Sequence, residues 1–262
     1  MLGRIWAIAL NNFREAVRMW VLYGVLFLVV FVNAVAIWVG EASIEHGPRV
    51  ARDVGLAATS LFGSLTAIFL GVFLLYTEVQ RRTIHSIVSK PIERWEFVIG
   101  KYLGMALLLS FLVGVFAVAM VLMLALQGMG VSDAIPKAIV LAWFEVLTVA
   151  AIAIFFSSFS TPFLSGIFAL ALWAIGRLTP DIEAAARDAS PAISWTAKIT
   201  LQIVPDLHLF SVSGHVVDGT HVSVHADFVS WGYIGLASLH ALGWIVGLLA
   251  ASALLFHRRD FV

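Results

Sequence analysis

The strongest constraint on this chain is a series of apolar stretches, each about as long as a helix that crosses a membrane. A bilayer core of about 30 Å needs about 20 apolar residues of helix. Since a helix satisfies its own backbone hydrogen bonds, such stretches predict transmembrane helices. We expect six of them in a single domain over residues 1–262, and therefore an all-α membrane protein. The six expected spans are residues 20–39, 56–77, 97–126, 138–159, 162–178 and 229–256.

The composition supports the same class of protein. Hydrophobic residues make up 61% of the chain and charged residues 12%, whereas a soluble domain is about a quarter charged. This excludes a soluble enzyme and a disordered scaffold. The 16 Lys and Arg residues are balanced by 16 Asp and Glu residues, so no net positive charge favours nucleic acid as a partner. The absence of cysteine excludes thiol catalysis and cysteine metal sites. Membrane lipid is the expected surrounding.

The distribution of basic residues predicts the orientation in the membrane, because cytoplasmic segments carry an excess of Lys and Arg. With a cytoplasmic N-terminus, ten of the 16 basic residues lie on that side, five of them in or next to the loop between the second and third spans. We therefore expect both termini in the cytoplasm. The ten are Arg4, Arg14, Arg18, Arg81, Arg82, Lys90, Arg94, Lys101, Arg258 and Arg259.

Residues 1–18 are expected to form an interfacial (elbow) helix at the membrane surface. Apolar residues recur every three or four positions and polar residues occupy the opposite face, as in helices that lie in the headgroup layer. The apolar run that follows is too long for the core of a signal peptide, so we expect the first span to be retained. The apolar stripe is Leu2, Trp6, Ala9, Phe13 and Val17, and the polar face is Arg4, Asn11, Glu15 and Arg18.

The cytoplasmic loop over residues 78–96 connects the second and third spans and is rich in basic residues. A positive loop that fixes orientation is its simplest interpretation. Pro91 disfavours helix at Lys90, so we expect a short helix to end there. Glu93 and Glu96 then lie in the first turn of the next helix, where negative charge is favourable.

Several residues of this loop follow a recognisable order: Glu78, Arg82-Thr83, Pro91-Ile92, Arg94 and Gly100-Lys101. The last span ends with Phe256, followed by Arg258, Arg259 and Asp260. This pattern resembles the type-2 permease family of ATP-binding-cassette (ABC) exporters, whose first cytoplasmic loop and last span carry these motifs. The expected spans and elbow helix fit as well, so the resemblance covers nearly the whole chain.

The resemblance implies a permease subunit whose residues 78–90 fold as a coupling helix against a separate cytoplasmic ABC ATPase subunit. It also implies an exporter of the bacterial cytoplasmic (inner) membrane that contains a second permease copy or a paralogue. The residues expected to contact the ATPase are Arg81, Arg82, Thr83 and His85. Those expected to hold the geometry of the loop are Glu78, Pro91, Arg94 and Lys101.

The sequence contains no P-loop. That motif requires a glycine five residues before its Gly-Lys pair and a serine or threonine after it. The Gly100-Lys101 pair has Trp95 and Tyr102 in those two positions. We therefore expect ATP and Mg²⁺ to bind the partner ATPase, and we expect no catalytic residue, cofactor or metal site in this chain.

Glu145 is the only carboxylate well inside an expected span. Because an acidic residue is costly in the bilayer, it is expected to face the bundle interior, water or a polar partner. Structural support, lining of a pathway and proton coupling all remain open, although the sequence offers no partner acid or base at the same depth. The alternative functions are a proton-coupled secondary transporter that uses Glu145 and a non-transporting membrane assembly subunit.

Residues 179–228 form a long external segment with four histidines, His208, His215, His221 and His225. Without cysteine, a zinc site would need these and an aspartate such as Asp218 or Asp227. Since residues 222–224 are typical of a strand rather than a helix, we expect a partly re-entrant external cap and no metal. In the resembled family this region closes the outer end of the transport path.

Overall fold

The computed structural model describes residues 2–42, 47–80, 93–126, 134–187, 190–211, 215–217, 220–222 and 230–257. The long helices are α1 (Leu2–Val17), α2 (Trp20–Ala42), α3 (Gly47–Gln80), α5 (Arg94–Leu126), α6 (Ala134–Phe159), α7 (Pro162–Arg177) and α10 (Trp231–His257). The segment between α7 and α10 contains α8 (Thr179–Arg187), α9 (Pro191–Ile203), the short 3₁₀ helix η1 (Leu207–Phe210) and the strands β1 (His215–Val217) and β2 (Thr220–Val222).

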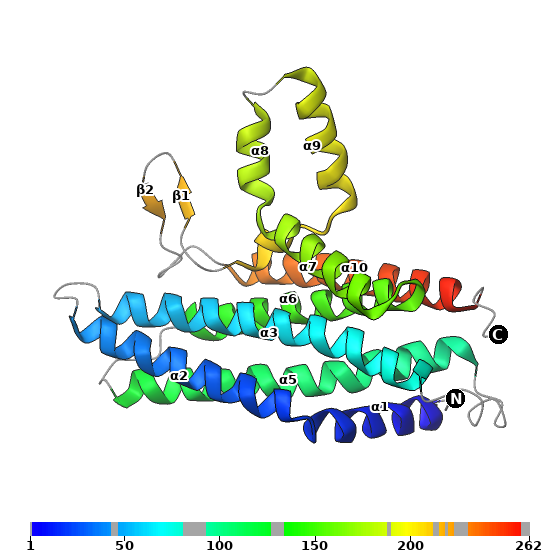
Figure 1. Ribbon diagram of the computed structural model, residues 1–262. Helices are drawn as coiled ribbons and strands as arrows, with labels where there is room; N and C mark the ends of the chain where they lie inside the picture. The colour runs from blue at the N-terminus through cyan, green and yellow to red at the C-terminus, as the bar shows by residue number, and fades with distance from the viewer. Residues whose placement is uncertain are drawn as a thin grey trace.

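The long helices form one bundle in which α6 is the central member (Figure 1). It contacts α3, α5, α7 and α10, and every residue from 145 to 154 is buried. Glycines let α3 approach it closely, because a Cβ atom on Gly63 would lie 2.7 Å from Val146 Cγ2 and one on Gly71 would lie 2.6 Å from Ala153 Cβ. This is the small-residue packing that transmembrane helices use.

Four helical segments of the described residues are long and apolar enough to cross a membrane. They are Val54–Phe73, Trp95–Leu122, Ile135–Phe159 and Trp231–Leu255. Two bent pairs raise the count to six if each is taken as one span: α1 with α2, bent by 63°, and α7 with α8, bent by 62°. The expected six spans are therefore the upper end of a range from four to six. The helix α3 also extends beyond the expected span 56–77 at both ends.

The helix α1 lies lengthwise against α5 (Figure 1). A Cβ atom on Gly104 of α5 would lie 2.5 Å from the carbonyl oxygen of Ala9, so the two backbones nearly touch. The buried face of α1 is formed by Ile5, Ala9, Asn12 and Ala16. It is rotated from the expected apolar stripe, in which Trp6 is 53% exposed. The stripe is therefore only partly the packed face, because Ala9 is buried and Phe13 and Val17 pack against the core while Trp6 stays exposed. Close packing of the two backbones selects small side chains at the contact.

The segment after α7 leaves the bundle and returns to it. The helices α8 and α9 project from the bundle beside the β1–β2 hairpin (Figure 1). The strands pair antiparallel, with His215 opposite Val222. Of the segment 222–224 expected to be a strand, Val222 belongs to β2 and residues 223–224 lie outside the described residues. Trp195, Ile199 and Ile203 share one face of α9 and are exposed.

Candidate functional site

Glu145 is completely buried within α6 and lies among side chains from two other helices. Its Oε1 atom lies 2.6 Å from Nη1 of Arg177, and its Oε2 atom accepts a 2.5 Å hydrogen bond from the Ser60 hydroxyl. The Arg177 guanidinium also donates to Ser60 Oγ, and Trp173 Nε1 donates to Oε1 at 3.4 Å. We call this cluster of Ser60, Glu145, Trp173 and Arg177 the polar node.

The helix ends explain why these side chains meet. Trp173 and Arg177 are four residues apart and therefore lie on the same face of α7. Arg177 is the last residue of that helix, immediately before the bend of 62° into α8. Ser60 comes from α3, which packs along α6. The polar node thus ties the end of α7, where the chain leaves the bundle, to two long helices.

The charges of the polar node balance each other inside the bundle. A buried ion pair recovers its desolvation cost only when the remaining polar atoms are hydrogen-bonded. Here both carboxylate oxygens of Glu145 accept hydrogen bonds, while the Arg177 side chain keeps 23% of its surface exposed. Disruption of the polar node would therefore leave a charge in an apolar environment.

A small cavity of about 10 Å³ lies beside the polar node. This volume is close to the minimum for one water molecule, so the described conformation holds no substrate-sized space at this position. The cavity is lined by Leu56, Ala57, Ser60, Ala138, Ala142, Arg177, Phe210 and Ser211.

The η1 segment covers the polar node on the side of this cavity. Leu207 and Phe210 are buried, and the Asp206 carboxylate accepts a 3.1 Å hydrogen bond from the backbone N–H of His208, which caps η1. A Cβ atom on Gly176 would lie 2.6 Å from the carbonyl oxygen of Pro205. The absence of a side chain at Gly176 therefore lets the returning chain lie directly on the end of α7.

The expectation that Glu145 has no basic partner is wrong, because Arg177 pairs with it. The two residues are 32 positions apart, and the basic-residue pattern places Arg177 on the external side. The available signal was the length of the fifth expected span, residues 162–178. A helix this short ends before it has crossed a 30 Å core, which leaves its terminal arginine within reach of Glu145.

The expected ATPase contacts lie outside the described residues. Arg81, Arg82, Thr83 and His85 fall in the segment 81–92, as does Pro91. Glu78 belongs to the last turns of α3 and Arg94 is the first residue of α5, while their side chains also lie outside the described part of the chain. The coupling-helix assignment therefore stays a prediction.

The beginning of α5 is described and has the expected acidic first turn. The Glu96 carboxylate accepts a 3.3 Å hydrogen bond from the backbone N–H of Glu93, which is one half of a capping box. The Glu93 carboxylate accepts a hydrogen bond from Trp95 Nε1. The expectation that a helix starts here with Glu93 and Glu96 at its N-terminal end is confirmed.

Lys101 is buried and bonds to α1. Its Nζ lies 3.0 Å from Asn12 Oδ1, and its carbonyl oxygen accepts a 3.0 Å hydrogen bond from Asn12 Nδ2. The Asn12 side chain thus binds both the side chain and the backbone of Lys101. Lys101 therefore joins the start of α5 to the N-terminal helix, a role that no sequence motif indicates.

The external histidines are only partly described. His225 lies outside the described residues, and so do the side chains of His215 and His221. Within the part of the chain that the structure covers, no three His, Asp or Glu side chains gather into a group that could hold a metal ion.

A bundle of apolar helices held by a buried ion pair defines an integral membrane protein of the polytopic helical class. Comparison with protein families then identifies which family of membrane proteins it is. Residues 6–261 match the family described as ABC-2 family transporter protein. The chain therefore belongs to the ABC-2 transporter family, whose members are membrane permease components of transporters. A comparison with curated proteins found no match.

Proposed function

We propose that this chain is the permease subunit of an ABC exporter, and that it moves its substrate by alternating conformations driven by a separate ATPase subunit. The family match over nearly the whole chain carries this proposal. Since the sequence has no P-loop, ATP and Mg²⁺ bind the partner. Two permease copies, or this chain and a paralogue, form the pathway in the bacterial inner membrane.

The arrangement of the helix ends supports one ATPase-facing side. The beginning of α1, the end of α3, the beginning of α5 and the end of α10 lie at the same end of the bundle (Figure 1). Eight of the ten basic residues assigned to the cytoplasm lie in these helix ends or in the segments that connect and extend them, whereas Arg14 and Arg18 lie at the other end of α1. This end is therefore the cytoplasmic end in our proposal, with both termini and the coupling helix at residues 78–90 on that side.

The polar node argues against a proton-coupled transporter. A proton relay needs a carboxylate that alternates between water and a second titratable group. Glu145 is completely buried and accepts hydrogen bonds from Arg177, Ser60 and Trp173. These contacts suit a structural role. The external segment, which returns to the end of α7 through η1, then closes the outer end of the path.

Purification of the tagged chain from native membranes in a mild detergent tests the proposal. We expect a soluble P-loop ATPase to co-purify at about one copy per permease, identified by mass spectrometry. Recovery of the chain without an ATPase, even after cross-linking through position 82, would contradict it. Transport by the chain alone under a pH gradient, lost in Glu145→Gln, would instead establish the proton-coupled alternative.

We expect Arg82→Glu to uncouple ATP hydrolysis from transport, because reversing a charge at the ATPase contact replaces attraction with repulsion. In reconstituted vesicles the transport per ATP hydrolysed should fall at least tenfold, while thermal unfolding of the bundle stays unchanged. Lys198→Glu, a matched reversal on the exposed surface of α9, serves as the control. Unaltered coupling in Arg82→Glu would remove this residue from the proposed contact.

A further inference from the structure

The helix α1 presents three different faces. One packs on α5 through Ile5, Ala9, Asn12 and Ala16. A second is an apolar flank that contains the half-exposed Trp6. The third, which we call the arginine face, points away from α5 at the 100° spacing of a helix. It consists of Arg4, Asn11, Arg14 and Glu15, together with Arg18 in the turn that follows α1, and it closely matches the polar face expected from the sequence.

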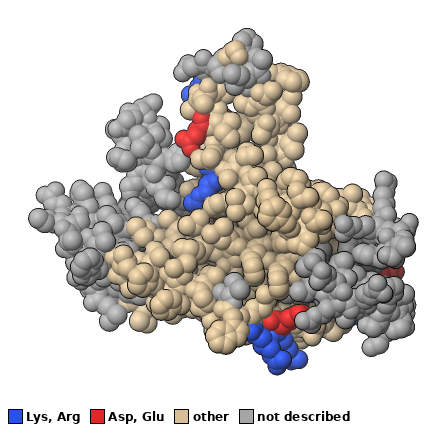
Figure 2. All heavy atoms as spheres, viewed as in Figure 1, with Lys and Arg blue, Asp and Glu red and all other residues tan. Residues whose placement is uncertain are grey.

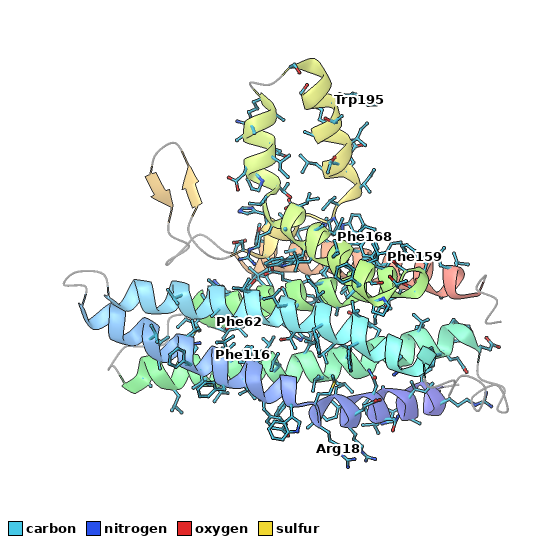
Figure 3. All side chains as sticks on the ribbon, in the orientation of Figure 1. Arg18, Phe62, Phe116, Phe159, Phe168 and Trp195 are labelled. Atoms are coloured by element: carbon cyan, nitrogen blue, oxygen red, sulfur yellow. The ribbon has the colours of Figure 1, made fainter. Side chains whose placement is uncertain are left out.

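The guanidinium groups of Arg14 and Arg18 stand free on the arginine face. Both residues are exposed, and Arg18 points away from the bundle (Figure 3). Within the described residues no carboxylate lies within ion-pairing distance of either group. Like charges four positions apart repel each other, so this pair favours a bound anion. Arg14 and Arg18 against Glu15 leave this end of the arginine face with a charge of +1 (2 − 1).

The position of these arginines relative to the membrane identifies the anion. Trp20, two residues after Arg18, begins the apolar helix α2 and is 90% exposed, and Tyr23 on the next turn is 56% exposed. Exposed Trp and Tyr residues at the start of an apolar helix mark the headgroup layer. Figure 2 shows basic side chains, with an acidic side chain beside them, at the lower edge of the molecule, where α1 and α2 meet in Figure 1. Arg14 and Arg18 therefore lie at the depth of lipid phosphates.

We propose that Arg14 and Arg18, with Trp20 beside them, bind the headgroup of an anionic phospholipid. Guanidinium groups form paired, charge-assisted hydrogen bonds to phosphate oxygens. Trp20, at the start of α2, contacts the acyl chains next to that headgroup. An ATPase surface is a less suitable occupant, because the exposed Trp20 and Tyr23 at the start of an apolar helix match a lipid boundary rather than water.

The site also has a consequence for coupling, which rests on the proposed function. The helix α1 is fixed to α5 by the double contact between Asn12 and Lys101 and by the close approach at Gly100 and Gly104. The helix α5 begins directly after the segment 81–92. A lipid held by α1 therefore restrains the end of α5 that leads to the coupling loop, so anionic lipid is expected to raise coupling efficiency.

Native mass spectrometry of the purified, delipidated full chain tests the lipid site. The probes are phosphatidylglycerol and phosphatidylcholine with identical acyl chains. Each basic residue near a membrane surface contributes about fivefold to anionic lipid binding, so we expect at least a tenfold preference for phosphatidylglycerol. Arg14→Gln/Arg18→Gln should abolish that preference. The control Arg187→Gln/Lys198→Gln, which removes two exposed charges elsewhere, should retain it.

Three results would overturn the proposal. The first is a wild-type chain without the preference, and the second is a double variant that keeps it while eluting and melting like the wild type. The third is full displacement of the lipid by excess inorganic phosphate, which would make the site one for free phosphate. A variant that keeps lipid binding but loses the ATPase would assign the arginine face to a protein. The lipid measurement needs no ATPase, so its outcome is separate from that of the proposed function.

Discussion

Arg177→Gln is expected to lower the free energy of unfolding by about 4 kcal/mol. Removing one partner of a buried ion pair leaves the other charge unpaired, at a cost of about 3–5 kcal/mol. The charge left behind belongs to Glu145, which is completely buried. Glu145→Gln should cost less, about 3 kcal/mol, because the remaining guanidinium is 23% exposed and can turn toward water.

The double variant Glu145→Gln/Arg177→Gln separates a true ion pair from two independent effects. We expect a total loss of about 4 kcal/mol rather than the sum of about 7, since neither charge is then unpaired. Denaturant unfolding in detergent measures the free energy of unfolding of all three variants. The control Lys198→Gln changes an exposed residue, and its free energy of unfolding should stay within about 0.5 kcal/mol of the wild type. Additive losses in the double variant would show that the two residues do not act as a pair.

A pair of glycine substitutions in α5 tests the contact with α1. Gly104→Ala is expected to destabilise the fold by about 2 kcal/mol, because overpacking forces neighbouring backbones apart. Its new Cβ would lie 2.5 Å from the carbonyl oxygen of Ala9 and 2.7 Å from Asn12 Cβ. Gly114→Ala, ten residues further along the same helix, meets no atom within 4 Å. It should stabilise the fold by about 0.5–1 kcal/mol through helix propensity alone.

The opposite signs of these two effects make the experiment decisive. Melting temperature in detergent should fall for Gly104→Ala and rise for Gly114→Ala. Stabilisation by Gly104→Ala would indicate that α1 does not pack on α5 as described.

The sequence is sufficient to predict apolar helices of membrane-crossing length, because that requirement depends on local composition. It cannot decide how each helix ends or bends. Residues 56–77 satisfy the length rule, yet α3 runs from Gly47 to Gln80. The bend at Leu178 is one of the two bends that make the number of spans range from four to six. It depends on the contact of the returning chain with Gly176 and on the hydrogen bond from Arg177 to Ser60 of α3. Such contacts join segments far apart in sequence.

Of the residues that form the polar node, the sequence indicates only Glu145. A carboxylate inside an apolar stretch is visible in the sequence, so Glu145 stands out. Its partner Arg177 has the same appearance as any basic residue at the end of a span, and Ser60 resembles other small residues of α3. The contact between Asn12 and Lys101 is hidden for the same reason. Periodicity shows which residues share a helix face, but it cannot show which neighbouring helix that face will meet.

The brevity of α7 has a consequence for the choice of lipid. Its 16 residues rise about 24 Å, whereas the hydrocarbon core is about 30 Å thick. A helix shorter than the core must thin the surrounding bilayer or remain below its surface. Lipids with shorter acyl chains reduce this mismatch and bring the corner at Leu178 to the headgroups. Bilayer thickness is therefore a variable that acts directly on the end of α7, independently of the charge of the lipid.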